Sequence, residues 1–485
     1  MRSDPVRPGL MVIHGNRPEV LRDLLVTWMH RYPLAPLATE TILVQSNGIA
    51  QWLKMALARD EAQGGCGISA GIEVLLPAKF LWRTYRAVLG AHAVPEVSAL
   101  DKQPLTWRLI RLIPQLLTRP GFETLHRFLA DDPECRRRLQ LAQRLSDIFD
   151  QYQVYRADWL EDWAGGHDRL RRLGMADGPP IPEGERWQAD LWRAVAADVG
   201  DAAGSSRGGV HRRFVRELNE AQTSPAGLPE RVIVFGISSM PAQALEALSA
   251  IARHAQVLLC VHNPCRHHWS DIVADKDVAR QVYRRQQRRP GMPADLDDDA
   301  LHYHAHPLLA AWGRQGRDYI ALLDRHDQPG HYRSHVGEVT GDRIDLFEES
   351  DASSLLRQLQ DDILDLRPLH ETRLQWPDVN IARDTSLRMH SVHSIQREVE
   401  VLHDQLLARF DADPNLRARD IIVMTPDINA YAPYIDAVFG LPGRDDVRHI
   451  PYAVSDQVQR GHDPVHIALE HLLHLPDSRW AVSEI

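Results

Sequence analysis

Lysine is rare in this sequence. Only Lys54, Lys79, Lys102 and Lys276 occur among 485 residues, and none of them follows a glycine. The G-K-[ST] loop, which cradles nucleotide phosphates with backbone N–H groups and one lysine, is therefore absent from the chain. This absence excludes a P-loop ATPase site. Because lysine is rare, nearly all of the 56 basic residues are arginine.

Cysteine and long apolar runs are also scarce. The four cysteines are too few and too scattered for a disulfide framework, which agrees with a reducing compartment. No apolar run approaches the roughly 18 residues of a membrane span, and the start Met1–Pro5 lacks an apolar signal segment. A cytoplasmic protein without a membrane partner is therefore expected.

The charge balance is acidic. The net charge of −10 argues against a protein that coats DNA nonspecifically, because such binding depends on broad neutralisation of phosphates. A local basic channel stays possible, since arginines cluster at Arg136–Arg138, Arg169–Arg172 and Arg284–Arg289. Each cluster taken alone is interpreted as a solvated helix face.

The first elements have the order of a P-loop domain without its loop. Met11–His14 is a short apolar strand, Gly15–Arg17 is a turn, and Pro18 opens an amphipathic helix. The turn is too short to wrap a phosphate and has no lysine to neutralise one. The pattern predicts the frame of a nucleotide-binding fold without its chemistry.

The remainder of the first part predicts a parallel sheet interrupted by helices. Strands are expected at Thr41–Gln45, Arg231–Phe235 and Gln256–Val261, with a helix at 242–253 between the last two. Residues 76–220 show mainly helical periodicity. The fold class is therefore α/β with a large helical insertion, and 44% apolar residues in a chain of this length suggest two to four domains.

A second α/β unit is predicted near the end of the chain. Residues 290–307 and 367–384 are rich in Pro, Asp and His and are expected to be loops or linkers. The elements expected after them are strands at Ser386–His390 and Asp420–Met424 and helices at Ile395–Arg409 and Ala430–Phe439. Because the chain stops at Ile485 without a terminating cap, we expect a fragment of a larger protein.

Metal and catalytic motifs are weak. Cys260–His268 holds two cysteines and three histidines, but Cys260 and His262 close a predicted buried strand and no second ligand pair has zinc-finger spacing. A core thiol with a polar loop is the preferred interpretation, so no metal is assigned. No G-x-S-x-G motif occurs, and Asp295–Asp299 is interpreted as solvated acid, so no catalytic residue is assigned.

The run Gln45–Trp52 is a better candidate for binding. It follows the carboxyl end of a predicted parallel strand, where doubly wound sheets bind ligands. Glutamine and asparagine amides can each make paired hydrogen bonds to a base edge. The plainer interpretation is that Ser46 or Asn47 caps the following helix, which is compatible with binding.

A second polar face lies in Asp147–Arg156. Helical spacing puts Asp147, Asp150 and Gln151 on one face, and Trp159 follows shortly. The face is either an ordinary wet surface or the wall of a groove in which bases stack on aromatic rings.

Several runs together resemble one family, the RecC subunit (gamma chain of exonuclease V) of the bacterial RecBCD helicase–nuclease. The matching runs are Ile42–Ser46 with Gly48 and Ala50–Leu53, Phe149–Tyr152, Val154–Arg156, Asp158–Leu160, Asn263–Arg266 with Trp269, Pro307–Ala310, Gly316–Ile320, Gln396–Asp404 and Asp420–Met424. These runs span essentially the whole chain, whereas members of this family are much longer.

The resemblance implies superfamily 1 helicase-like domains whose ATP site is lost. Residues 8–75 and 228–366 would form domain 1A, 76–227 the helical insertion 1B, and 385–485 the start of domain 2A. The family splits duplex DNA, channels the 3′-ended strand and recognises Chi in double-strand break repair by homologous recombination. Its partners are DNA, RecB and RecD, and no cofactor is expected in this chain because ATP and magnesium belong to the partner subunits.

The resemblance also implies a set of Chi-reading residues. Asn47 and Ile148 stand where the best-known pattern has threonine and leucine. The transferred positions are Gln45, Asn47, Gln51, Leu76, Trp82, Asp147, Ile148, Asp150, Gln151, Arg156 and Arg207. The alternatives are an active helicase or nuclease subunit of the related AddB type, which the missing G-K-[ST] loop disfavours, and a purely structural scaffold.

Overall fold

The computed structural model describes residues 6–171, 177–200, 206–269, 306–341, 343–376, 383–455 and 464–474. The chain forms two compact units, Met1–Asn380 and Ile381–Ile485, each with its own contacts. No helix within these described ranges is long and apolar enough to cross a membrane.

A five-stranded parallel sheet organises the first unit, in the order β1-β5-β4-β2-β3. The strands are β1 (Gly9–Gly15), β2 (Glu40–Leu43), β3 (Ile72–Leu75), β4 (Arg231–Phe235) and β5 (Gln256–His262). The α/β class and four of the strands are thereby confirmed. Strand β3, a short edge strand that contains a glutamate, was not predicted from the sequence.

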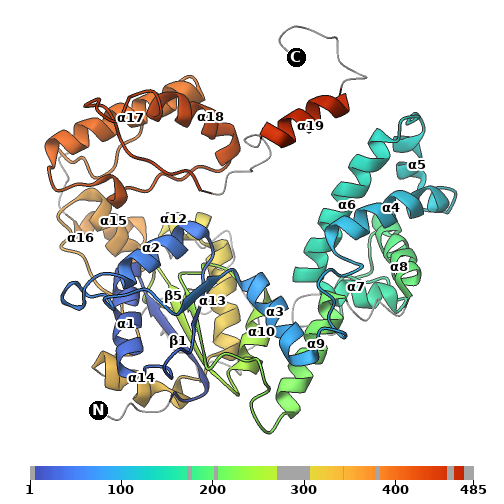
Figure 1. Ribbon diagram of the computed structural model, residues 1–485, viewed down its shortest axis with the longest axis horizontal. Coiled ribbons are helices and arrows are strands. Elements are labelled where there is room, and N and C mark those ends of the chain that lie inside the picture. Colours follow the sequence, from blue (N-terminus) through green and yellow to red (C-terminus); the bar gives the residue numbers. More distant parts are fainter. Residues whose placement is uncertain are drawn as a thin grey trace. The chain divides into compact units, whose positions relative to one another are not determined.

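Helices cover both faces of this sheet (Figure 1). Alternate strand residues such as Val12 and Leu43 pack against one set of helices, and Ile13 and Ile42 pack against the other. Burial on both faces explains why these strands are nearly continuous apolar runs. The first set includes α3 (Pro77–Leu89), α9 (Arg207–Glu220), α10 (Ala242–Ile251), α12 (Pro307–Trp312) and α13 (Arg314–His326), and the second α1 (Pro18–Arg31), α2 (Asn47–Leu57) and α14 (Arg333–Thr340).

The amino-terminal edge of the sheet carries a buried ion pair. Arg231 is fully buried, and its Nε lies 3.0 Å from Glu40 Oε2. Its Nη1 donates to the Tyr32 carbonyl at 2.8 Å. These contacts join the first residues of β2 and β4 to the end of α1, so the pair is part of the framework of the sheet.

The elements described between β3 and β4 are helical, as the periodicity predicts. This segment has a hydrophobic core of its own, which includes Leu109, Phe149 and Trp192. Its helices between α3 and α9 are α4 (Lys102–Leu116), α5 (Glu123–Leu129), α6 (Arg136–Tyr155), α7 (Ala157–Ala164) and α8 (Trp187–Val199).

The second unit departs from prediction. Its expected helices are confirmed as α17 (Ile395–Ala412) and α18 (Ile428–Phe439), and α19 (Pro464–His474) follows. Ser386–His390 and Asp420–Met424 were expected as strands, but the structure assigns no strand to either range. Ile422 is 78% and Met424 88% exposed. A high β-propensity produces a strand only where another strand pairs with it, and the described residues of this unit offer none.

Two predicted loops have different outcomes. The prediction for 367–384 is wrong in part, because Pro368 precedes a short helix, α16 (Leu369–Gln375), and α15 (Leu355–Leu364) lies just before. Proline is well suited to helix starts, which explains this error. Most of 290–307 lies outside the described residues, although Pro307 begins α12.

Candidate nucleic-acid interface

The turn between β1 and α1 is covered by an acidic segment. The backbone N–H of Leu346 donates to the His14 carbonyl at 2.7 Å, which extends the edge of β1. Asn16 exchanges two hydrogen bonds with the backbone of Glu348, at 2.8 and 2.9 Å. The Glu348 carboxylate lies 3.3 Å from Arg17, directly before α1. A carboxylate paired with Arg17 therefore lies near the start of α1, the part of the helix that holds phosphate in a P-loop protein.

Four of the candidate residues follow the carboxyl ends of β2 and β3, which are neighbouring strands. Ser46, not Asn47, caps α2, because its Oγ accepts from the Ile49 N–H at 3.4 Å. Asn47 and Gln51 are exposed and lie one helical turn apart on α2. Gln45 lies two residues beyond the end of β2. Leu76, which is 43% exposed, precedes α3.

Gln45 is joined to the loop after another strand. Its Oε1 accepts a hydrogen bond from Ser238 Oγ at 3.1 Å, and Ser238 follows β4. Both side chains are at the surface. The bond to Ser238 uses the carbonyl oxygen of Gln45, and its amide N–H groups have no hydrogen-bond partner among the residues that the structure describes.

Trp82 has features of both a core residue and a surface residue. It is half-buried on α3 and packs against the helices on one face of the sheet. Its ring lies 6.3 Å from that of Tyr85 in an edge-to-face arrangement. Trp82 therefore contributes to the core while part of its surface remains open.

The residues predicted to share one polar face of α6 are partly or fully exposed. Asp147 forms an ion pair with Lys102, Ile148 is half-buried and Gln151 is exposed. Asp150 lies 3.2 Å from Arg207, the first residue of α9. Arg207 and Asp150 are thus brought together from segments far apart in the sequence.

A second carboxylate completes this cluster. Arg207 Nη2 also lies 3.3 Å from Asp101 Oδ1, so one guanidinium joins Asp101 and Asp150. The three side chains are between 25% and 34% exposed. Ion pairs at such exposure contribute at most about 1 kcal/mol, so breaking them costs little free energy.

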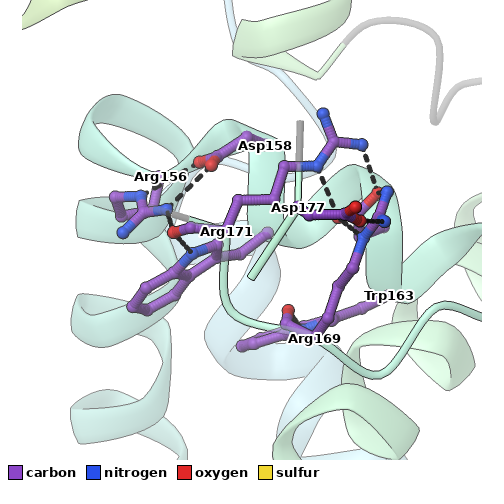
Figure 2. Close-up of polar contacts among 8 residues, drawn as sticks. Arg156, Asp158, Trp163, Arg169, Arg171 and Asp177 are labelled. Atoms are coloured by element: carbon purple, nitrogen blue, oxygen red, sulfur yellow. Dashed lines mark hydrogen bonds and ion pairs between the residues drawn. The ribbon is translucent and has the colours of Figure 1, made fainter. Parts of the chain in front are cut away.

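Arg156 is engaged in internal contacts (Figure 2). Its guanidinium stacks 3.9 Å from the ring centre of Trp159 and lies 2.8 Å from Asp158. It also contacts the backbone carbonyl of Arg171, to which Trp159 Nε1 donates at 3.0 Å. Arg156 therefore holds the segment near residue 171 against α7.

The same segment is fixed by a buried carboxylate. Asp162 is only 4% exposed, and Arg169 Nε and Arg171 Nε lie 2.7 and 2.6 Å from its Oδ2. Arg169 also reaches Asp177 at 2.8 Å (Figure 2). Burial alone would raise the pKa of Asp162, but the hydrogen bonds from Arg171 and Arg169 lower it well below its usual range.

The interpretation of Arg169–Arg172 as a solvated helix face is wrong for its described members. Arg169 and Arg171 lie in a loop and bind a buried acid. The cluster Arg136–Arg138 does lie at the mostly exposed start of α6. Arg172 and Arg284–Arg289 lie outside the residues that the structure describes.

A polar chain that was not predicted from the sequence joins α3, α9 and α10. Tyr85 Oη and His211 Nδ1 are 3.0 Å apart, and His211 Nε2 lies 3.0 Å from Glu246 Oε2. Burial raises the pKa of Tyr85, so its hydroxyl stays protonated and can donate to Nδ1 while Nε2–H donates to Glu246. The hydrogen bond from His211 lowers the pKa of Glu246. Nothing in the sequence distinguishes His211 among 25 histidines.

The cysteine-rich run serves the fold. Cys260 and Cys265 are buried, and burial raises the pKa of Cys260 to about 12. Asn263 Oδ1 accepts from Trp269 Nε1 at 3.0 Å and from the Cys265 N–H at 3.2 Å. No group of three or more His, Cys, Asp or Glu residues suited to a metal is present in the described ranges. Asp295–Asp299 lies outside them.

Comparison with known proteins identifies one family. The family model "RecC, N-terminal domain" matches residues 10–366. The chain is 38% identical to the RecBCD enzyme subunit RecC of Escherichia coli K12, over 98% of this chain and 42% of that protein. It is 33% identical to the Haemophilus influenzae subunit, over 98% of the chain and 43% of the relative. The corresponding Mycolicibacterium smegmatis protein is 30% identical over 89% of the chain and 35% of its own length. The chain thus spans less than half of these relatives.

Proposed function

The chain belongs to the RecC family, and on that premise we propose that it is a non-catalytic DNA-binding part of a RecBCD-type complex. In this role it splits duplex DNA, passes the 3′-ended strand onward and recognises Chi during double-strand break repair. RecB and RecD are the proposed partners, and they supply the ATP and magnesium chemistry. The relatives are themselves named as subunits of the RecBCD enzyme.

The proposed fold is a superfamily 1 helicase-like fold without an ATP site. The parallel sheet with helices on both faces supports this, as does the order of β1, a tight turn and α1. The turn Asn16–Arg17 between β1 and α1 is too short to wrap a phosphate. The scarcity of lysine argues in the same direction.

The proposed domains follow the same plan. Residues 8–75 and 228–366 form domain 1A, and 76–227 form the insertion 1B. The sheet takes β1 to β3 from before the insertion and β4 and β5 from after it, which supports a discontinuous domain 1A. The separate hydrophobic core of the helical segment supports domain 1B. Residues 385–485 would begin domain 2A.

The observation that carries Chi recognition is the Asp101–Arg207–Asp150 cluster. Asp150 and Arg207 were both assigned by resemblance, from segments that are distant in sequence, and they lie 3.2 Å apart. Exposed amides on α2 form a second group of assigned residues. Amide, carboxylate and guanidinium groups are those that read base edges. Arg156, in contrast, is proposed to act by positioning the loop that it contacts.

The test is to assemble the full-length protein with RecB and RecD and to map where DNA degradation pauses. Gln51→Ala and Asp150→Ala should abolish the response to Chi while unwinding persists, because loss of one base contact costs about 1–3 kcal/mol without dismantling the complex. Gln143→Ala, an exposed glutamine on α6, is the matched control. Loss of all unwinding in the first two variants would instead indicate a scaffold. ATP turnover by the chain alone would indicate an AddB-type enzyme.

A further inference from the structure

The loop between β4 and α10 presents two adjacent serines at the carboxyl edge of the sheet. Ile237 and Met240, on either side of them, are 3% and 7% exposed, so both flanks of the serine pair are anchored in the core. Ser238 is exposed and Ser239 is half-buried. The loop therefore holds two hydroxyl groups beside the end of β2, the strand that pairs with β4.

Ser238 holds one end of the Gln45 side chain. Its hydroxyl donates to Gln45 Oε1 at 3.1 Å, and its backbone N–H lies 3.5 Å from the same oxygen. A backbone N–H can only donate, so the Gln45 atom that faces it is the carbonyl oxygen and not the amide nitrogen. The orientation of this amide thus follows from the chemistry of its partner. The Gln45 Nε2 has no partner within the described ranges.

The backbone of Gln45 is fixed as well. Val44 before it is 1% exposed, and the Val44 N–H donates to the Leu75 carbonyl at 3.0 Å. Ser46 after it caps α2 through its Oγ. With a strand end on one side and a helix cap on the other, the remaining freedom of Gln45 lies in its side-chain torsions, and the bond to Ser238 restricts these.

The second serine makes a separate contact. Ser239 Oγ accepts a hydrogen bond from Gln315 Nε2 at 2.9 Å, and Gln315 belongs to α13. The two adjacent hydroxyl groups thus have different partners. Ser239 is therefore a matched control for Ser238, because it lies in the same loop and its hydroxyl contacts a different glutamine.

We propose that Ser238 is a positioning residue for strand recognition, which holds Gln45 so that this side chain reads a base through its amide N–H donors alone. The inference rests on the proposed function, because that function brings the 3′-ended strand to Gln45. A glutamine that rotates freely offers a donor and an acceptor side by side, the pattern that pairs with adenine. With Oε1 held by Ser238, Gln45 instead offers N–H donors, which suit a carbonyl or ring-nitrogen acceptor on the base.

The test uses the full-length protein assembled with RecB and RecD. The sequence at which the wild-type complex pauses is placed in the 3′-ended tail of a duplex, and its binding is compared with that of the same tail in scrambled order. Ser238→Ala should lower the preference for the pause sequence about two- to ten-fold, the cost of immobilising a side chain that is no longer held in advance. Ser238→Thr keeps a hydroxyl and should retain the preference, and so should Ser239→Ala.

Gln45→Glu tests the donor role. Glutamate keeps an oxygen for Ser238 but replaces the amide N–H groups with a second acceptor, so the preference should fall about ten-fold, as expected for a lost base contact. The added negative charge weakens binding of both tails alike and therefore cancels in the comparison. A preference that is unchanged in Gln45→Glu or in Ser238→Ala would overturn the inference.

A double variant shows whether Ser238 acts through Gln45. In a Gln45→Ala background, Ser238→Ala should cause no further loss of preference. An equal loss in both backgrounds would mean that Ser238 contacts the strand itself, and this would also overturn the inference. The proposed function fails by a different result: a wild-type complex that binds both tails equally would refute it, whereas a preference that is lost in Asp150→Ala and intact in Ser238→Ala would refute only the role of Ser238.

Discussion

The Tyr85–His211–Glu246 chain leads to a prediction about how α3 and α9 are held together. In His211→Phe the ring keeps roughly its size, but the buried Tyr85 hydroxyl loses its acceptor. A buried polar group left unpaired costs about 1–3 kcal/mol. Glu246 is about half exposed and can turn to water. We therefore expect His211→Phe to weaken the packing of α3 on α9 by about 2 kcal/mol.

A double variant isolates the hydrogen bond. Tyr85→Phe removes the hydroxyl that His211→Phe leaves unpaired, so the two changes together should cost about 1 kcal/mol less than the sum of the single changes. Hydrogen exchange of peptides covering α3 and α9 measures the free energy of local opening. A loss of 2 kcal/mol corresponds to about 30-fold faster exchange. His331→Phe, at an exposed position, is the control.

The same variant should affect recognition. Arg207 precedes His211 by one turn of α9, and Trp82 precedes Tyr85 by three residues on α3. Loosening the packing of α3 on α9 should therefore weaken the response to Chi in the assembled complex. Additive costs of Tyr85→Phe and His211→Phe, or unchanged hydrogen exchange in α3 and α9 of His211→Phe, would show that the Tyr85–His211 hydrogen bond does not hold the two helices together.

Three further predictions concern other parts of the chain. The full-length protein without its partners should neither bind nor hydrolyse ATP, because the turn before α1 is too short to wrap a phosphate and has no lysine; turnover that persists through purification would contradict this. Trp82→Ala should lower stability by about 2 kcal/mol, roughly half the cost at a fully buried aromatic, and should weaken strand binding; a loss of 3–5 kcal/mol with unchanged binding would make Trp82 a core residue only. Asp162→Asn should speed hydrogen exchange in 167–171 at neutral pH. In wild type the pKa of Asp162 is lowered, so the ionised carboxylate stabilises the fold above about pH 4. This stabilisation is lost only as the pH falls through the folded-state pKa of Asp162. Loss of hydrogen-exchange protection in 167–171 at a higher pH would argue against the ion cluster.

The sheet could largely be predicted from the sequence because its strands are buried on both faces. Such strands are continuous apolar runs, as in Arg231–Phe235, and they are recognisable without knowledge of their neighbours. Edge strand β3 is four residues long and only partly buried, so its pattern is ambiguous. Asp420–Met424 has the composition of a strand but no partner strand among the described residues, which local pattern cannot reveal.

The candidate site was predictable only where it is local. Helical spacing correctly put Asp147, Asp150 and Gln151 on one side of α6. The contact of Asp150 with Arg207 and that of Tyr85 with His211 join residues far apart in the chain. Such pairs depend on how helices pack, which neither periodicity nor composition encodes.

The exposed run Asp420–Met424 has a consequence for handling the protein. Four successive apolar residues of high β-propensity, without proline or an internal charge, resemble the short segments that nucleate intermolecular sheets. Concentrated samples of this chain should therefore self-associate through that run and form β-rich aggregates. Replacing Ile422 with lysine would add the kind of gatekeeper charge that suppresses such growth, and light scattering would reveal the improvement in colloidal behaviour.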